Sequence, residues 1–245
     1  MVNVATSRSG CFASTWPQSV YPNLWIWSAT GTNFFDDELY PRKFLLDTPE
    51  AISALQFLQD LRWRYHVMPQ PGESADFLQG TASMNVIGHW TLTVYLKNAT
   101  FKWGLLTIPQ KNYAVQRADG SCWSVVESTN HAREAWEFVK FAAGMQGLSL
   151  WAREQFITPA HRLVASSDLW LRVPGHPHIS KVPFVYGVEK HAFNGYGLVH
   201  PRRDSFFSVI DAALNRVYNK ETDPKSAISS IIPVIEKLLA EVAAR

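Results

Sequence analysis

The segment from residue 49 to residue 108 alternates helical and strand-like patterns, and this alternation limits the folds open to the chain. A helix is predicted over 49–65, where a Thr-Pro-Glu start precedes apolar residues spaced three or four positions apart. Strand-like runs follow at 82–87 and 102–108, with a helical turn over 89–97 between them. Because helices alternating with short strands are typical of α/β proteins, we predict an α/β fold.

The second half of the chain is predicted to be mostly helical. Asn130 is an expected N-cap for one helix, and Asp204 opens another. Asp223 and Pro224 form another helix start in which a capping residue precedes a proline. An apolar stripe with helical spacing follows and continues to the C-terminus. Residues 158–203 are rich in Pro, His and Gly and are predicted to be mostly loops.

The composition excludes several classes of protein. Hydrophobic residues make up 47% of the 245 residues and charged residues 18%, which fits a folded chain and not a disordered one. The 23 basic and 21 acidic residues leave a net charge of +2 and are scattered, so we expect no nucleic-acid partner. No apolar run approaches the roughly 20 residues of a membrane-spanning helix, and residues 1–11 lack the pattern of a signal peptide.

The metal-ligating and catalytic residue types form no recognisable site. Four histidines fall in or near the predicted loop region: His176, His178, His191 and His200. No carboxylate or cysteine accompanies them at a ligand spacing, so we expect no metal and no other cofactor. Asp36 and Asp37 are adjacent, whereas glycoside hydrolases hold two carboxyl groups apart on different elements. We therefore expect no catalytic residues.

Tryptophan is unusually frequent, with ten in the chain. An indole ring laid against the C–H face of a sugar supplies apolar contact, while polar neighbours bond the sugar hydroxyls. Four tryptophans lie near turns or element ends: Trp25, Trp27, Trp90 and Trp123. Three others lie within helical patterns and fit core positions: Trp63, Trp136 and Trp151. Core packing stays the alternative for each of the first four, because Trp is mostly buried.

Residues 77–90 carry the pattern F-x-x-G-x-A-x-M followed by G-x-W. Further short segments lie before and after this pattern, in this order along the chain: 46–51, 54–58, 101–104, 120–121, 135–141 and 158–160. Together they resemble the sugar-binding proteins of ABC importers, the extracellular solute-binding family that includes maltose-binding protein.

The resemblance implies a type II periplasmic-binding-protein-like fold, an α/β fold with two lobes that close over a sugar. Residues 1–110 and 165–245 would form the second, C-terminal lobe, and 111–164 part of the first. The family begins with a longer N-terminal section that has no counterpart here, so the first lobe would be incomplete. We then expect an isolated chain that binds sugar weakly or not at all. We also expect four side chains to be partly exposed: Trp136, Phe138, Phe141 and Trp151.

The resemblance also implies a function without bond-making. Such a protein captures a mono- or oligosaccharide by aromatic stacking and delivers it to the transmembrane permease subunits of an ABC transporter. It works as a monomer outside the cytoplasm, in the periplasm or at the cell surface. Two alternatives stay open: a stand-alone carbohydrate-active enzyme, which needs a pair of carboxylates facing a cleft, and a sugar-binding module with aromatic rings on a flat exposed face.

Ligand-binding residues also follow from the resemblance. Trp90 matches the tryptophan of the family's cleft, at the start of the helix after the G-x-W turn. Ser121 stands where a second glycine is common in a loop that approaches the ligand. The implied ligand-binding set is Trp90, Trp123, Gly120, Ser121, Phe207, Trp25 and Trp27.

Overall fold

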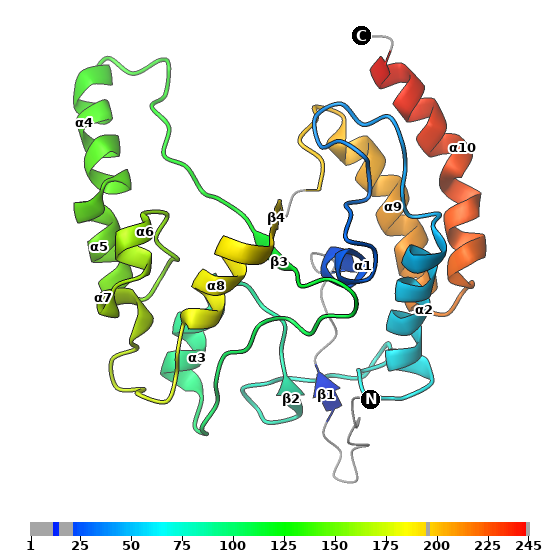
Figure 1. The fold of residues 1–245 in the computed structure, drawn as a ribbon, viewed down its shortest axis with the longest axis horizontal. Helices are drawn as coiled ribbons and strands as arrows, with labels where there is room; N and C mark the ends of the chain where they lie inside the picture. The colour runs from blue at the N-terminus through cyan, green and yellow to red at the C-terminus, as the bar shows by residue number, and fades with distance from the viewer. Residues whose placement is uncertain (1–11, 15–21, 195–196, 244–245) are drawn as a thin grey trace. The chain divides into compact units, whose positions relative to one another are not determined.

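The computed structural model describes residues 12–14, 22–194 and 197–243 (Figure 1). The chain divides into two compact units. Unit 1 combines Met1–Val86, Ile108–Arg117 and Phe193–Arg245, and unit 2 combines Ile87–Thr107 and Ala118–Ala192. No helix among the described residues is both long and apolar enough to cross a bilayer.

Unit 1 is built on four helices. They are α1 (Pro22–Thr30), α2 (Pro49–Trp63), α9 (Arg203–Tyr218) and α10 (Pro224–Ala243). In Figure 1, α10 runs beside α9, and both contact α2. Leu55, Ile210 and Ile235 come from three of these helices and are fully buried in one apolar core. The apolar stripes predicted for these helices therefore form the core of the unit.

The start of α2 shows how local sequence fixes a helix boundary. Thr48 has extended backbone angles, and its side chain accepts a hydrogen bond from the N–H of Ala51 at 3.4 Å. Pro49 occupies the first turn, where its missing N–H costs no helical bond, and Glu50 lies near the positive end of the helix dipole. The predicted helix over 49–65 is confirmed, two residues shorter at its C-terminal end.

Strands are short in the described part of the chain. β1 (Phe12–Ser14) pairs in parallel with β2 (Ala82–Met84), with Phe12 opposite Ala82. β3 (Gln116–Ala118) pairs with β4 (Ala192–Asn194). The prediction of a strand over 102–108 is wrong, since that stretch is irregular and mostly exposed. An apolar run does not form a strand without a neighbour to pair with.

Unit 2 is a set of shorter helices. They are the 3₁₀-helix η1 (His89–Thr91), α3 (Leu92–Asn98), α4 (Ala132–Ala143), α5 (Met145–Arg153), α6 (Arg162–Ala165), α7 (Asp168–Leu171) and α8 (Val182–His191). The predicted helical turn over 89–97 is confirmed as η1 and α3. The N-cap of α4 is His131, one residue after the predicted Asn130. Ala152 and Trp170 lie at the centre of a small core shared by α5, α6 and α7.

The compact units and the predicted lobes divide the chain at different points. Residues 87–107 and 165–192, which we assigned to the second lobe, share unit 2 with residues 118–164. Compactness alone does not identify a lobe, so the assignment of 1–110 and 165–245 to a second lobe and of 111–164 to a first stays a prediction.

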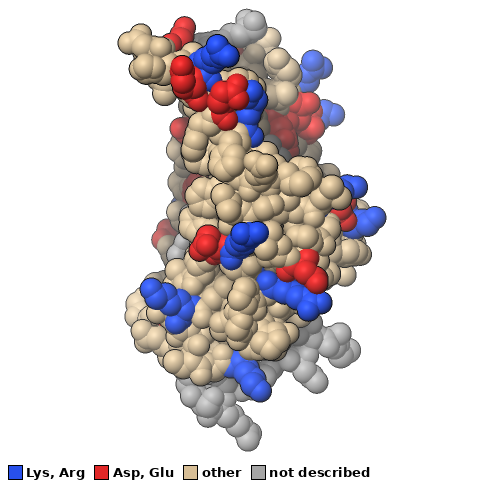
Figure 2. Space-filling view, turned by 90° about the vertical axis from the view of Figure 1, so that its left-hand side faces the viewer, with Lys and Arg blue, Asp and Glu red and all other residues tan. Residues whose placement is uncertain are grey.

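One apolar face of α4 and α5 is exposed. Ala142 is the single buried residue of α4, while Trp136 is 54% exposed and Phe138 and Phe141 are similarly open. Figure 2 shows this side of unit 2, where charged side chains are scattered between larger uncharged areas. The exposure predicted from the sequence is confirmed for these three side chains, and Trp151 is partly buried.

We expect this face to make the isolated chain self-associate, because large exposed apolar patches drive association in water. Replacing Trp136 and Phe141 together with serine should increase the monomer fraction measured by size-exclusion chromatography with light scattering. A serine pair in place of Leu106 and Val126, also exposed in unit 2, is the matched control. A wild-type chain that stays monomeric at tens of micromolar would contradict the expectation.

Candidate functional site

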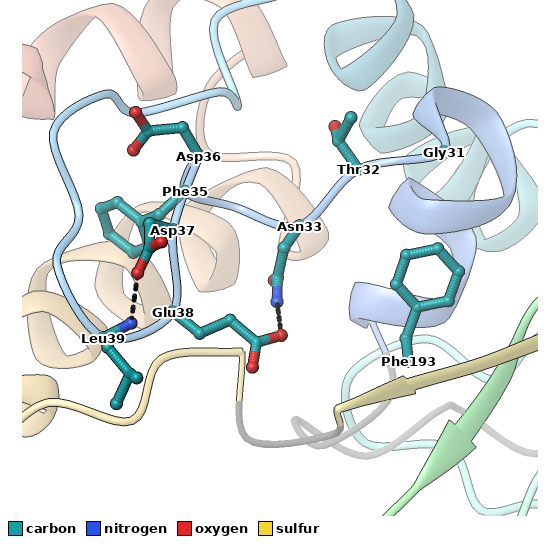
Figure 3. A pocket seen from close by; sticks show the side chains of 9 residues that line it. All are labelled: Gly31, Thr32, Asn33, Phe35, Asp36, Asp37, Glu38, Leu39 and Phe193. Carbon is teal, nitrogen blue, oxygen red and sulfur yellow. Dashed lines mark hydrogen bonds between the residues drawn. The ribbon is translucent and has the colours of Figure 1, made fainter.

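A pocket of about 510 Å³ lies in unit 1, beside the loop that leaves α1 (Figure 3). Nine residues line it: Gly31, Thr32, Asn33, Phe35, Asp36, Asp37, Glu38, Leu39 and Phe193. Eight are consecutive or nearly so, and the ninth, Phe193, comes from β4. The pocket is therefore lined by one loop and by a strand that lies far from that loop in the sequence.

Gly31 sets the direction of this loop. Its N–H bonds to the carbonyl oxygen of Trp27 at 2.7 Å, which closes α1, and its φ of +72° is in the region that favours glycine. A Cβ at Gly31 would also lie 2.9 Å from the ring of Tyr113. The chain can therefore turn into the pocket loop at this point only with glycine.

A hydrogen-bonded series runs from the core into the pocket. The indole Nε1 of Trp27 donates to Oδ1 of Asn33 at 3.2 Å, and Nδ2 of Asn33 donates to Oε1 of Glu38 at 3.3 Å. The backbone N–H of Phe34 donates to the same Oδ1 at 2.8 Å. These two donors fix which end of the Asn33 amide faces Glu38, and so orient the carboxylate at the pocket wall (Figure 3).

Asp36 and Asp37 fold the rest of the loop. Oδ1 of Asp36 accepts the backbone N–H groups of Arg42 and Lys43 at 2.9 Å each. Burial acts to raise the pKa of Asp36, but these backbone hydrogen bonds outweigh it and lower the pKa. The backbone N–H groups of Tyr40 and Leu39 likewise lower the pKa of Asp37. Both carboxyl groups are therefore ionised at neutral pH, which suits loop closure and not proton donation.

Phe193 supplies the aromatic wall. Its ring stacks on Trp27 with centroids 5.1 Å apart and planes 18° apart, and its side chain is half-buried. The pocket thus offers an apolar ring next to an amide and carboxylates, with no basic side chain in its lining. That combination can hold a neutral, hydroxyl-bearing molecule.

The structure places the predicted site residues of unit 1 in or against the core. Trp27 is fully buried, Phe207 is buried and stacks on Phe34 at 5.9 Å, and Trp25 packs against Phe57 at 6.3 Å. None of Trp25, Trp27 and Phe207 lines the pocket. The indole of Trp27 lies against Phe193 and Asn33 and supports them, and its direct contact with a ligand stays a prediction.

The predicted residues of unit 2 are on its surface. Trp90 in η1 is 56% exposed, and its ring lies so close to Gly88 that a Cβ there would be 2.0 Å from it. Gly120, Ser121 and Trp123 lie in one exposed loop, and Trp123 makes an edge contact with Phe138 at 5.6 Å. The side chains of Trp90 and Trp123 and the backbone of Gly120 and Ser121 are therefore accessible to a ligand.

Sequence reasoning missed Asn33, Glu38 and Phe193. The turn at Gly31 and the acidic run after it were visible signals of a loop, but nothing in the sequence connects Phe193 with them. Among the described residues no group of three or more His, Cys, Asp or Glu side chains could hold a metal ion. The rings of His176 and His178 are 6.0 Å apart.

Comparison with known proteins identifies the family. The family described as bacterial extracellular solute-binding protein matches residues 1–177. No curated protein matches. The chain belongs to this family, as predicted from the F-x-x-G-x-A-x-M and G-x-W pattern.

Solved structures confirm the fold. An ABC substrate-binding protein from Listeria monocytogenes in complex with cycloalternan matches 96% of this chain with a TM-score of 0.72 and 15% identity. A solute-binding protein from Thermotoga lettingae bound with α-D-tagatose matches 94% at 0.69 and 20% identity. The cyclic α-maltosyl-1,6-maltose binding protein from Arthrobacter globiformis matches 94% at 0.70 and 16% identity.

These likenesses show a periplasmic-binding-protein-like fold, so the predicted fold class is confirmed. The chain spans about 60% of the length of each of these structures, namely 60%, 59% and 60%.

Proposed function

We propose that this chain is the carbohydrate-binding component of an ABC importer. Its membership of the extracellular solute-binding family is the observation that carries the proposal. Three similar structures bind cycloalternan, tagatose and a cyclic maltosyl-maltose, which are carbohydrates. The pocket of unit 1 and the exposed rings of unit 2 have the chemistry that such ligands need.

The proposed binding chemistry has an apolar and a polar part. Phe193 offers a ring for the C–H face of a sugar, and Glu38 and Asn33 can exchange hydrogen bonds with its hydroxyl groups. In unit 2, Trp90 and Trp123 offer larger exposed faces for stacking, and Gly120 and Ser121 offer an open backbone. Trp25 and Phe207 take part through the core that holds the pocket loop.

The remaining parts of the proposal concern the whole importer component. Closure of two lobes over the sugar would be followed by delivery to the permease subunits, with the protein working as a monomer outside the cytoplasm. The proposal includes no catalysis. The lowered pKa values of Asp36 and Asp37 support this, since a glycosidase acid needs a raised pKa.

Calorimetric titration of the chain with neutral mono- and oligosaccharides at millimolar concentration tests the proposal. We expect weak binding of at least one sugar and a loss of about fivefold in affinity for Phe193→Ala, because a stacked ring contributes about 1 kcal/mol. Glu38→Gln should lose more, about tenfold or above, because hydrogen bonds to charged groups contribute about 1.5–3 kcal/mol.

Two variants outside the pocket serve as controls. Tyr65→Ala removes an exposed ring just after α2, and Glu236→Gln removes an exposed carboxylate on α10. Both should bind like the wild type. Equal losses in pocket and control variants would count against the proposal.

A further inference from the structure

Unit 2 encloses a lysine whose amine has no hydrogen-bond partner. Lys181 precedes α8 and is fully buried, and its Nζ lies 3.5 Å from the ring centroid of Trp170 on α7. No hydrogen-bond acceptor reaches this Nζ within the described parts of the chain. A buried ammonium is normally paired with an anion, so this position is unfavourable for the charged form.

A second basic side chain shares these apolar surroundings. The ring of His89 on η1 lies 4.6 Å from Trp170 and 5.1 Å from Phe184 on α8, measured between centroids. Its Nδ1 and Nε2 are buried, and a hydrogen-bond interaction with the backbone of Phe156 acts to raise the pKa of His89 against the effect of burial. The ring of Trp170 therefore contacts both bases, and Phe184 contacts His89, in a largely buried cluster of His89, Trp170, Lys181 and Phe184.

Carboxylates on the surrounding elements are engaged elsewhere. Asp168 on α7 pairs with Arg172 at 3.1 Å, and Glu189 on α8 pairs with Arg162 at 3.4 Å, with all four side chains largely in solvent. The other titratable groups on these elements and at their ends are Arg153 and Glu154 at the end of α5, His161 before α6, and Tyr186, Lys190 and His191 in α8. No ion pair connects any of them to Lys181 or His89 among the described residues.

Burial lowers the pKa of Lys181 to about 7. Burial, and next the positive charge of Lys181, lower the pKa of His89 to about 4. In the unfolded chain both groups take up protons at higher pH, near their ordinary pKa values of about 10.4 and 6.5. Folding therefore competes with protonation at both positions.

We propose that Lys181 and His89 form an acid-sensitive element that loosens the packing of α7 and α8 around Trp170 as the pH falls. In the packed unit Lys181 is mostly neutral above about pH 7 and His89 above about pH 4. Because the unfolded state binds more protons, the free energy of unfolding falls from about pH 10.4 down to about 7 through Lys181, and again from about 6.5 down to 4 through His89. The observations behind this element lie in unit 2 alone and do not depend on the proposed sugar binding.

Urea unfolding of the full chain between pH 6 and 10, followed by circular dichroism, tests the lysine step. Lys181→Met keeps the apolar bulk and removes the amine, and Lys190→Met removes an exposed lysine of α8 as the matched control. Between pH 7 and 10, the unfolding constant of wild type and control should rise about tenfold per unit of falling pH relative to Lys181→Met. The same pH slope in all three proteins would overturn the proposal.

The pKa of the Lys181 amine can also be measured directly in the wild-type protein, which does not require a stable variant. In wild-type protein labelled with ¹³C at the lysine Cε, one NMR resonance should titrate near pH 7. Its absence from spectra of Lys181→Met assigns it. If every lysine resonance of the wild type titrates above pH 9, the proposal is wrong.

The histidine step has its own pair of variants. His89→Phe should remove the additional loss of stability between pH 6.5 and 4, whereas His178→Phe, at an exposed loop position of the same unit, should keep it. Equal acid sensitivity of the two variants would exclude His89 from the element.

Discussion

Replacing Trp27 with alanine should lower the free energy of unfolding of unit 1 by about 3–5 kcal/mol, the range for a large aromatic side chain removed from a core. Trp27 is fully buried and packs with Leu24 and Val115. The change also removes the ring behind Phe193 and the donor that orients Asn33. Chemical denaturation measures the loss of stability, and calorimetry measures the accompanying loss of sugar binding.

Trp27→Phe separates the two contributions. Phenylalanine keeps a ring for Phe193 to stack on but has no N–H for Asn33, so we expect a smaller loss of stability and a pocket in which Glu38 is less well held. A Trp27→Ala variant that unfolds at the wild-type denaturant concentration would show that the indole is not part of the core.

Trp90→Ala should weaken sugar binding by about 2 kcal/mol or more, about 30-fold in affinity, without a matching loss of stability. The ring is 56% exposed, so its removal leaves no cavity, but a ligand stacked on it would lose its main apolar contact. Titration of mutant and parent with the same sugar measures the effect.

Trp136→Ala is the matched control for Trp90, because its ring is 54% exposed on the same unit and is not a predicted ligand contact. The control should bind sugar like the parent. If Trp90→Ala also binds like the parent, Trp90 is not a ligand contact, and the pocket of unit 1 would have to account for binding alone.

Signals that act over a few residues were the ones that sequence analysis could interpret. The Thr48 cap with Pro49 and Glu50 predicted α2 because capping depends on immediate neighbours. The strand predicted over 102–108 depended on pairing with a segment elsewhere, and the structure has irregular backbone over those residues. Local patterns therefore predicted the helices better than the sheets.

The candidate site shows the same limit. The turn at Gly31 was recognisable, yet Phe193 reaches that loop only through the folding of distant segments. The sequence also could not show that Trp27 is buried and Trp90 exposed, since both residues lie near the ends of predicted elements. Only the structure distinguishes a ring sealed behind Phe193 from a ring open to solvent.

The 3₁₀-helix η1 points two consecutive rings to different environments. His89 is turned into the buried cluster with Trp170, and the next residue, Trp90, is turned to the solvent. The two residues are consecutive in one short turn, so a shift of the η1 backbone that moves His89 also moves Trp90. By linkage, a ligand that immobilises Trp90 would make His89 harder to protonate, and acid that displaces His89 would lower the affinity at Trp90 by the same factor. The fraction of the protein that has ligand bound and its stability at low pH would thus depend on the same conformational equilibrium of η1.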